Sequence, residues 1–279
     1  MSSGSIRLAV VQTRSVDDRS TNLASAAAAI DEAAGAGAQL VMLPEIFSAP
    51  FVGESADDDY FRWAEPIDGP SNSMVRQRAA AHGVTVVSSI FEETAVAGVY
   101  HNTACVFEGD RLVRAYRKSH LPFSNGFPEK YYFRPGDEAP PVFAVGPARV
   151  GLIVCYERHF PELSRLVALG GAALMCVPAA CASAPTREVF QLELRAHAVF
   201  NSMYVACANR VGVEGTKDYY GSSVIYGPGG DTVAEASSDA AQVLVADIDV
   251  ATVTQRRRRL PYLRDRRPPL YRRLADFQE

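Results

Sequence analysis

Three reactive side chains that each stand where a strand-like run stops constrain the fold of this 279-residue chain most strongly. They are Glu45, Lys118 and Cys155. Short runs bounded by Pro, Gly or charge are typical of buried strands, and α/β proteins usually build their sites at the carboxyl ends of such strands. A carboxylate, an ammonium and a thiol delivered there fit the roles of base, oxyanion stabiliser and nucleophile. The pattern indicates acyl chemistry at a C–N bond.

Lysine is rare in this chain, which adds weight to Lys118. Only Lys118, Lys130 and Lys217 occur among the 28 basic residues, and the rest are arginines. A compact ammonium can enter a tight pocket that a planar guanidinium does not fit. The competing interpretation of Lys118 is a solvated charge at the end of a strand.

Strand-like and helix-like segments alternate along the chain, which predicts an α/β protein. The segment between Lys118 and Pro141 has little periodicity, and loops of this length in compact domains are usually functional. We expect helices over 20–34, 73–82, 161–169 and 186–201, and strands over 6–12, 40–45, 84–91, 99–107, 111–116, 142–145, 149–155, 172–177, 203–208, 222–226 and 243–248.

The two halves of the chain resemble each other. Residues 6–12 parallel residues 149–155, and each run is followed by a helix, a Gly break and a strand that ends in Pro, at Pro44 and Pro178. This weak repeat predicts two similar β-rich layers with helices outside. Whether the layers pack face to face does not follow from the sequence.

Composition fits a cytoplasmic enzyme with a large core. The net charge is −4 and 48% of residues are hydrophobic. The run Arg256–Arg259 has no interleaved aromatic residues, so we expect no nucleic-acid partner. No apolar run approaches the ~18 residues needed to span a bilayer, so we expect no membrane partner. Five cysteines without Cys-x-x-Cys and five histidines without ligand spacing predict neither a disulfide framework, a metal nor another cofactor.

Three ordered motifs resemble the signatures of the nitrilase (carbon–nitrogen hydrolase) superfamily: Leu43–Glu45, Arg117–Pro122 and Gly151–Arg158. The resemblance runs nearly end to end and implies one domain over residues 1–279 with a four-layer αββα sandwich fold. It also implies a homodimer or higher homo-oligomer, with residues 256–279 as a carboxyl-terminal tail that packs on the partner.

Within the superfamily, the chain looks most like the N-carbamoyl-amine hydrolases. Residues 155–162 and 207–212 resemble β-ureidopropionase, whereas residues 127–133 and 262–268 resemble N-carbamoylputrescine amidase. The resemblance implies a small amide or N-carbamoyl substrate, with N-carbamoyl-β-alanine as the leading candidate. N-carbamoylputrescine, ω-amides and aliphatic amides are alternatives. An amide-forming transferase or an inactive scaffold with this fold also stays open.

The resemblance also assigns roles to the reactive residues. Cys155 is the expected nucleophile and Glu45 its general base, while Lys118 and the backbone N–H of Tyr156 stabilise the oxyanion. Glu129 matches a further family glutamate that positions Lys118. A charge on a loop surface is the competing interpretation of Glu129.

Arg158 and His159 are the expected substrate-binding residues. In family members that act on N-carbamoyl amino acids, an arginine at the position of Arg158 clasps the substrate carboxylate, which suits guanidinium geometry. A structural ion pair of Arg158 with Glu157 or Glu162 is the alternative.

The other four cysteines have no predicted role in catalysis. Cys105, Cys176 and Cys207 lie in strand-like runs and are expected as small buried hydrophobes. Cys181 is expected in the pocket wall, without a charged neighbour to activate it.

Overall fold

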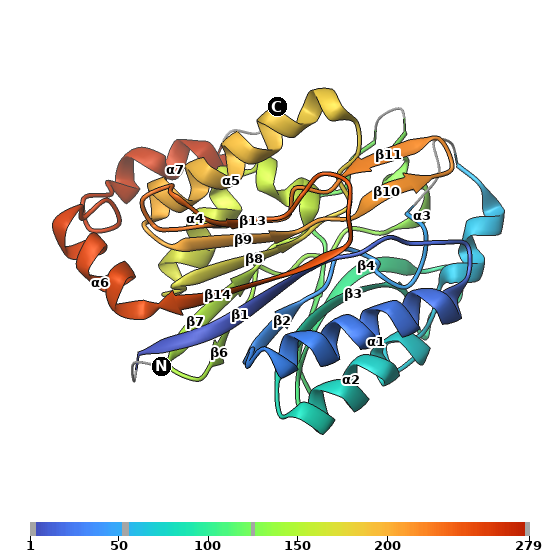
Figure 1. Cartoon of the computed structure of the whole chain (residues 1–279). Helices are drawn as coiled ribbons and strands as arrows, with labels where there is room; N and C mark the ends of the chain where they lie inside the picture. Colours follow the sequence, from blue (N-terminus) through green and yellow to red (C-terminus); the bar gives the residue numbers. More distant parts are fainter. Residues whose placement is uncertain (1–3, 52–55, 124–125, 277–279) are drawn as a thin grey trace.

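Two six-stranded sheets pack face to face between outer helices in the computed structural model of this chain, which describes residues 4–51, 56–123 and 126–276 (Figure 1). The expected four-layer αββα sandwich is confirmed. The first sheet has the spatial order β14 (Gln242–Asp249), β1 (Ser5–Gln12), β2 (Leu40–Met42), β3 (Thr85–Glu93), β4 (Tyr100–Glu108) and β5 (Arg111–Arg117). The second has the order β13 (Thr232–Glu235), β12 (Val224–Tyr226), β9 (Tyr204–Ala208), β8 (Leu174–Pro178), β7 (Ala148–Leu152) and β6 (Val142–Val145).

The two sheets share one topology, which confirms the internal repeat. In each, three neighbouring parallel strands (β1-β2-β3 and β7-β8-β9) are extended by antiparallel strands on both sides. The helices α1 (Arg19–Gly35) and α2 (Pro70–His82) cover the first sheet, and α4 (Pro161–Leu169) and α5 (Arg187–Asn201) cover the second (Figure 1). No helix in the described ranges is long and apolar enough to cross a membrane.

Side chains along β1 alternate between two cores. Ile6, Leu8 and Val10 belong to the core between the sheets, whereas Ala9 and Val11 pack in the core under α1 and α2. This alternation is the two-residue period of a strand. Because both faces of the strand are covered, the sequence of β1 is almost continuously apolar.

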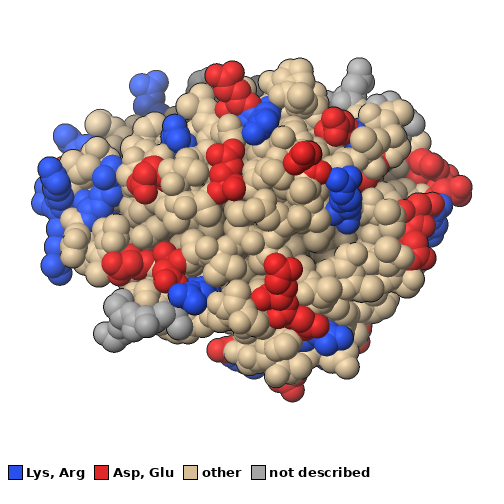
Figure 2. All heavy atoms as spheres, viewed as in Figure 1, with Lys and Arg blue, Asp and Glu red and all other residues tan. Residues whose placement is uncertain are grey.

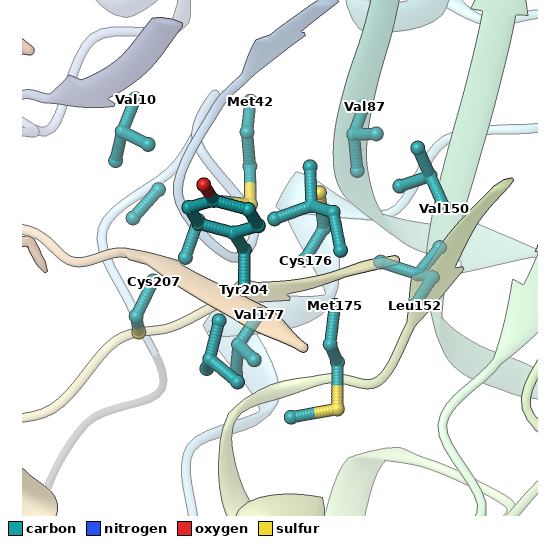
Figure 3. Close-up of a cluster of buried hydrophobic side chains, with 14 of the residues drawn as sticks. Val10, Met42, Val87, Val150, Leu152, Met175, Cys176, Val177, Tyr204 and Cys207 are labelled. Atoms are coloured by element: carbon teal, nitrogen blue, oxygen red, sulfur yellow. The ribbon is translucent and has the colours of Figure 1, made fainter. Parts of the chain in front are cut away.

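Apolar side chains from both sheets fill the space between them. Figure 3 shows Val10, Met42 and Val87 of the first sheet in one cluster with Val150 and Leu152 of the second. All five are fully buried. Their burial shows that the two sheets pack face to face, which the sequence left open. Apolar inner faces of this size are stable only when they pack against each other.

Several elements differ from the expectation. The strands predicted to reach Glu45 and Cys155 end at Met42 and Leu152, because the chain turns before it presents the reactive side chains. Four of the other elements that were not expected are short: α3 (Glu129–Tyr132) in the long loop, the hairpin of β10 (Val211–Glu214) and β11 (Lys217–Tyr220), and β13. Each is four residues long, too short to show a periodic pattern.

The carboxyl-terminal segment contains two helices, α6 (Val250–Arg259) and α7 (Pro268–Asp276). The Asp249 carboxylate caps α6, so the predicted tail boundary at residue 256 falls inside a helix. Basic side chains gather at the end of the molecule where α6 lies (Figure 2). One of them, Arg257, donates to the carbonyls of Ala172 (2.7 Å) and Asn201 (3.3 Å), which fixes α6 to the second half of its own chain.

Replacing Gly151 by Ala is expected to destabilise the fold. A Cβ at Gly151 would lie 2.1 Å from Cγ1 of the buried Val167, so β7 and α4 would have to separate. Overpacking of this kind typically costs about 1–3 kcal/mol in the free energy of unfolding. Urea unfolding would measure it, with Gly35→Ala as control because a Cβ there meets nothing within 4 Å. Equal urea midpoints for the two variants would contradict this packing.

Candidate active site

Glu45 lies fully buried in the loop after β2, where the two halves of the chain meet. Its backbone N–H donates to the carbonyl of Ala179, just after β8 (3.3 Å). The next residue, Ile46, has a φ of 45°, which a β-branched residue adopts only under constraint. The buried guanidinium of Arg210 supplies the constraint by donating to the carbonyls of Glu45 (2.7 Å), Ile46 and Ala49 (2.8 Å). The loop therefore holds Glu45 in a fixed position.

Lys118 follows β5 and places its ammonium between two carboxylates. Nζ donates to Oε1 of Glu45 (2.8 Å) and to both oxygens of Glu129 (2.9 and 2.8 Å). Asn102 of β4 donates to the same Oε1 of Glu45 (2.7 Å). The second oxygen, Oε2 of Glu45, is buried without a hydrogen-bond partner among the described residues, so it is an acceptor available to a further proton.

Burial and charge act against each other in this cluster. Burial lowers the pKa of Lys118, but the Glu129 and Glu45 carboxylates outweigh it and raise that pKa above its ordinary value. Burial raises the pKa of Glu129 to about 7, opposed by the charge of Lys118. Both side chains are at most 1% exposed, which excludes the interpretations as solvated surface charges.

Cys155 stands on a sharp turn after β7, at the start of a 3-10 turn and with a φ of 44°. The buried carboxylate of Glu157 holds this turn: it accepts from the N–H of Val154 (2.7 Å) and from the N–H and hydroxyl of Ser119 (2.8 and 2.6 Å). Ser119 follows Lys118 in the chain, so the Glu157 carboxylate connects the segment that carries Lys118 to the turn that carries Cys155. The charges of Glu45 and Lys118 both act on Cys155, so the sandwich joins the three predicted catalytic residues.

A second thiol lies beside the first. The sulfurs of Cys155 and Cys181 are 3.6 Å apart. This contact raises the pKa of Cys155 and lowers that of Cys181 to about 6, because the two sulfurs share one proton. The charge of Arg158 also lowers the pKa of Cys181, so the expectation that Cys181 has no charged neighbour is wrong.

Arg158 and His159 share one partner, Glu193 of α5. The guanidinium Nε of Arg158 is 3.0 Å from Oε2 of Glu193, and Nδ1 of His159 is 2.6 Å from Oε1. The alternative ion pairs of Arg158 with Glu157 or Glu162 do not form, because Glu157 is engaged at the Cys155 turn and Glu193 is nearer. Arg158 is therefore paired, but with a residue that the sequence did not indicate.

Arg158 also contacts the reactive thiol. Its Nη1 donates to the carbonyl of Cys155 (3.1 Å) and lies 4.0 Å from its sulfur. The guanidinium carbon lies 5.4 Å from the ring centre of Phe190. The cation thus forms one wall beside the thiol of Cys155.

Tyr156 follows Cys155 and lines a neighbouring cavity. Its backbone N–H belongs to the first residues of the 3-10 turn, where N–H groups have no acceptor within the turn. Tyr156, Ser119 and Lys130 line a cavity of about 430 Å³, and each is the chain neighbour of a predicted catalytic residue. In the described part of the chain, no group of three His, Cys, Asp or Glu side chains could hold a metal ion.

The sequence placed Cys181 in the pocket wall but did not indicate four other residues of this site. Asn102, Glu157, Arg210 and Glu193 orient the reactive groups, and Cys181 touches the sulfur of Cys155. Asn102 is a polar residue of the strand β4, and Arg210 closely follows β9, so both carry a weak signal. Glu193 lies on a helix with an ordinary amphipathic pattern, so nothing in its sequence context indicates a role in this site.

This combination of an αββα sandwich with a buried thiol, ammonium and carboxylates is that of an amidohydrolase. The chain matches the carbon–nitrogen hydrolase family over residues 7–258 and belongs to that family. It is 33% identical to an N-carbamoylputrescine amidase of Arabidopsis thaliana (92% of this chain, 90% of the relative) and 34% identical to a citrullinase of Francisella tularensis (95% and 96%).

Similar solved structures also support membership of the carbon–nitrogen hydrolase family. A carbon–nitrogen hydrolase from Helicobacter pylori superimposes with a TM-score of 0.91 at 30% identity, covering 97% of this chain and 98% of that chain. An amidase from Nesterenkonia sp. AN1 gives 0.81 at 30% identity, covering 98% and 97%, in a structure that shows covalent addition of the acetamide moiety of fluoroacetamide at the active-site cysteine. The chain is therefore an amidohydrolase of non-peptide C–N bonds.

Replacing Lys118 by Arg is expected to damage turnover nearly as much as Lys118→Ala, by about 10²–10³ in kcat/KM. The site has room for a compact ammonium between two carboxylates but not for the planar guanidinium of arginine. Ammonia-release kinetics would measure the loss. Arg114→Lys, at an exposed position of the same strand, is the control and should keep its rate. Near-normal turnover of Lys118→Arg would show that only a nearby charge is needed.

Proposed function

We propose that this chain hydrolyses short N-carbamoyl amino acids, best N-carbamoyl-β-alanine, through a covalent intermediate on Cys155. The observation that carries the proposal is the buried Lys118 ammonium, which joins Glu45 and Glu129 beside the thiol and leaves Oε2 of Glu45 without a partner in the described ranges. A base with a free oxygen, a fixed cation and a nucleophile are the three groups that acyl transfer from nitrogen needs.

The geometry supports the following sequence of steps. Glu45 takes the proton of Cys155 as the sulfur attacks the carbonyl carbon of the substrate. A bifurcated hydrogen bond to Glu129 leaves Lys118 one N–H for the resulting oxyanion, and the N–H of Tyr156 is the second donor. Glu45 then protonates the departing nitrogen, and a thioester-type intermediate remains. Water, deprotonated by Glu45, attacks that intermediate and releases the free thiol and a carbamic acid, which breaks down to carbon dioxide and an amine or ammonia.

The carboxylate of the substrate is assigned to Arg158. This side chain lies 4.0 Å from the sulfur of Cys155, and a guanidinium binds a carboxylate in bidentate fashion. Glu193 and His159 hold it from the other side. In this proposal the substrate carboxylate shares Arg158 with Glu193, while His159 contacts the other oxygen of Glu193.

N-carbamoylputrescine is the second candidate substrate. Relatives at 33% identity carry the name N-carbamoylputrescine amidase, and Glu193 offers a carboxylate on the same wall for an amine-bearing substrate. Relatives named omega-amidase support ω-amides as a third class.

An ammonia-release screen tests the proposal. It compares N-carbamoyl-β-alanine, N-carbamoyl-α-amino acids, N-carbamoylputrescine and simple ω-amides, with Cys155→Ala as the matched inactive variant. We expect N-carbamoyl-β-alanine to give the highest kcat/KM, with β-alanine, ammonia and carbon dioxide as products. Turnover by Cys155→Ala would refute the role of the thiol. Added hydroxylamine distinguishes acyl transfer from hydrolysis, because a transferase would release a hydroxamate.

Replacing Arg158 by Gln should weaken the carboxylate-bearing substrate selectively. Loss of one charged hydrogen bond corresponds to ~1.5–3 kcal/mol, or about 10- to 150-fold in kcat/KM. Rates on N-carbamoylputrescine should fall much less, because that substrate does not use the cation. Parallel kinetics on the two substrates give the ratio. An equal loss on both would mean that Arg158 supports the site without contacting the carboxylate.

A homodimer is part of the proposal. Exposed apolar side chains on the outer helices α4 and α5 support burial of that face against a second copy: Leu166, Leu169, Leu192 and Phe200. Packing of residues 256–279 on the partner and a cytoplasmic location also remain predictions from the sequence.

A further inference from the structure

Cys155 and Cys181 are free thiols in direct contact, and the proposed mechanism uses only the first. Their sulfurs are 3.6 Å apart, and no other pair of cysteine sulfurs in the described ranges is in contact. Cys155 is 7% exposed and Cys181 6% exposed, so both residues are buried. The proposed mechanism gives no role to Cys181, the second thiol beside the nucleophile.

The backbone at both cysteines is held by groups outside the pair. Asn209 accepts from the N–H of Cys181 (2.8 Å) and donates to its carbonyl (3.1 Å), while Glu157 holds the turn at Cys155. A disulfide has an S–S bond of about 2.0 Å, so the sulfurs must approach by about 1.6 Å. Because the backbone is held at both residues, this approach requires rotation of the side chains about their Cα–Cβ bonds.

The charges around the pair favour one thiolate. Arg158 faces both sulfurs and Lys118 faces Cys155, whereas the Glu45 carboxylate opposes them. The shared proton lowers the pKa of Cys181 to about 6 and raises that of Cys155. One negative charge is therefore held across two sulfurs, and the thiolate is the form of cysteine that peroxides oxidise.

We propose that Cys155 and Cys181 form a reversible disulfide when hydrogen peroxide oxidises the nucleophile, with Cys181 as the resolving cysteine. The proposal rests on the proposed function only in naming Cys155 as the nucleophile. The disulfide stops turnover by removing the attacking sulfur, and it protects Cys155 from irreversible oxidation to the sulfinic acid.

The chemistry balances with peroxide as the oxidant. The proton that the two sulfurs share moves to Cys181 as the sulfur of Cys155 attacks one oxygen of hydrogen peroxide. The O–O bond breaks, and the leaving hydroxide becomes water on protonation. Cys155 is then a sulfenic acid. The sulfur of Cys181 attacks that sulfenic sulfur, the S–O bond breaks, and a second water leaves with the proton of Cys181. A dithiol such as dithiothreitol reverses the change and is itself oxidised to a disulfide.

The test compares the wild-type protein, Cys181→Ser and Cys105→Ser after hydrogen peroxide and again after dithiothreitol. Cys105 is a buried cysteine under α2, in contact with Asn72, and serves as the control. Activity is scored for each variant as the fraction that dithiothreitol restores. Wild type and Cys105→Ser should recover most of their activity, while Cys181→Ser should recover several-fold less. Equal recovery of Cys181→Ser and wild type would overturn the proposal.

Peptide mapping of the wild-type protein gives a readout that needs neither turnover nor a variant. Peroxide should produce a cross-linked Cys155–Cys181 peptide that has lost two hydrogens, and its absence would overturn the proposal. Phenylarsine oxide, which bridges two neighbouring thiols with loss of one water, should add one arsenical across the same two residues. An adduct at any other cysteine pair would contradict the geometry. If the cross-link forms but no substrate is hydrolysed, the proposed function fails and the disulfide stands.

Discussion

The buried ammonium of Lys118 is the interaction on which the active site depends. Taking one cation and two carboxylates out of water is unfavourable, and their mutual attraction must offset that loss. Removing one partner of a buried ion pair typically costs about 3–5 kcal/mol, because a charge is left without compensation. Glu45, Lys118 and Glu129 come from three separate segments of the chain, so this single cation determines where those segments meet.

Two reactive residues stand at turns that the backbone does not favour, and each turn is held by a buried charge. Arg210 binds the carbonyls around Ile46, and Glu157 binds the donors around Cys155. Glu157 also accepts from the hydroxyl of Tyr116 in β5, the strand that leads to the ammonium. Strained backbone persists where the surroundings determine it fully, which gives catalytic side chains a position that thermal motion does not easily change.

The wall beside the Cys155 thiol carries a cation that has a part in both proposals. Arg158 lies against the thiol pair, and Glu193 balances its charge from α5. A cation in this place can orient a substrate carboxylate and also stabilise a thiolate, since both are anions. The same electrostatic arrangement thus underlies the proposed substrate preference and the proposed sensitivity of Cys155 and Cys181 to peroxide.

The sequence by itself predicted the α/β class, the internal repeat and the candidate reactive groups. Strand periodicity is visible in a short window, and the rarity of lysine and the repeat are visible when the whole chain is compared. Only the tertiary structure decided which residues support those groups. Asn102, Arg210 and Glu193 reach the site through contacts between segments distant in sequence, and no local pattern specifies such contacts. Lys118 is the clearest case: its position predicted a functional cation, but its protonation and role follow from two carboxylates that the fold brings to it.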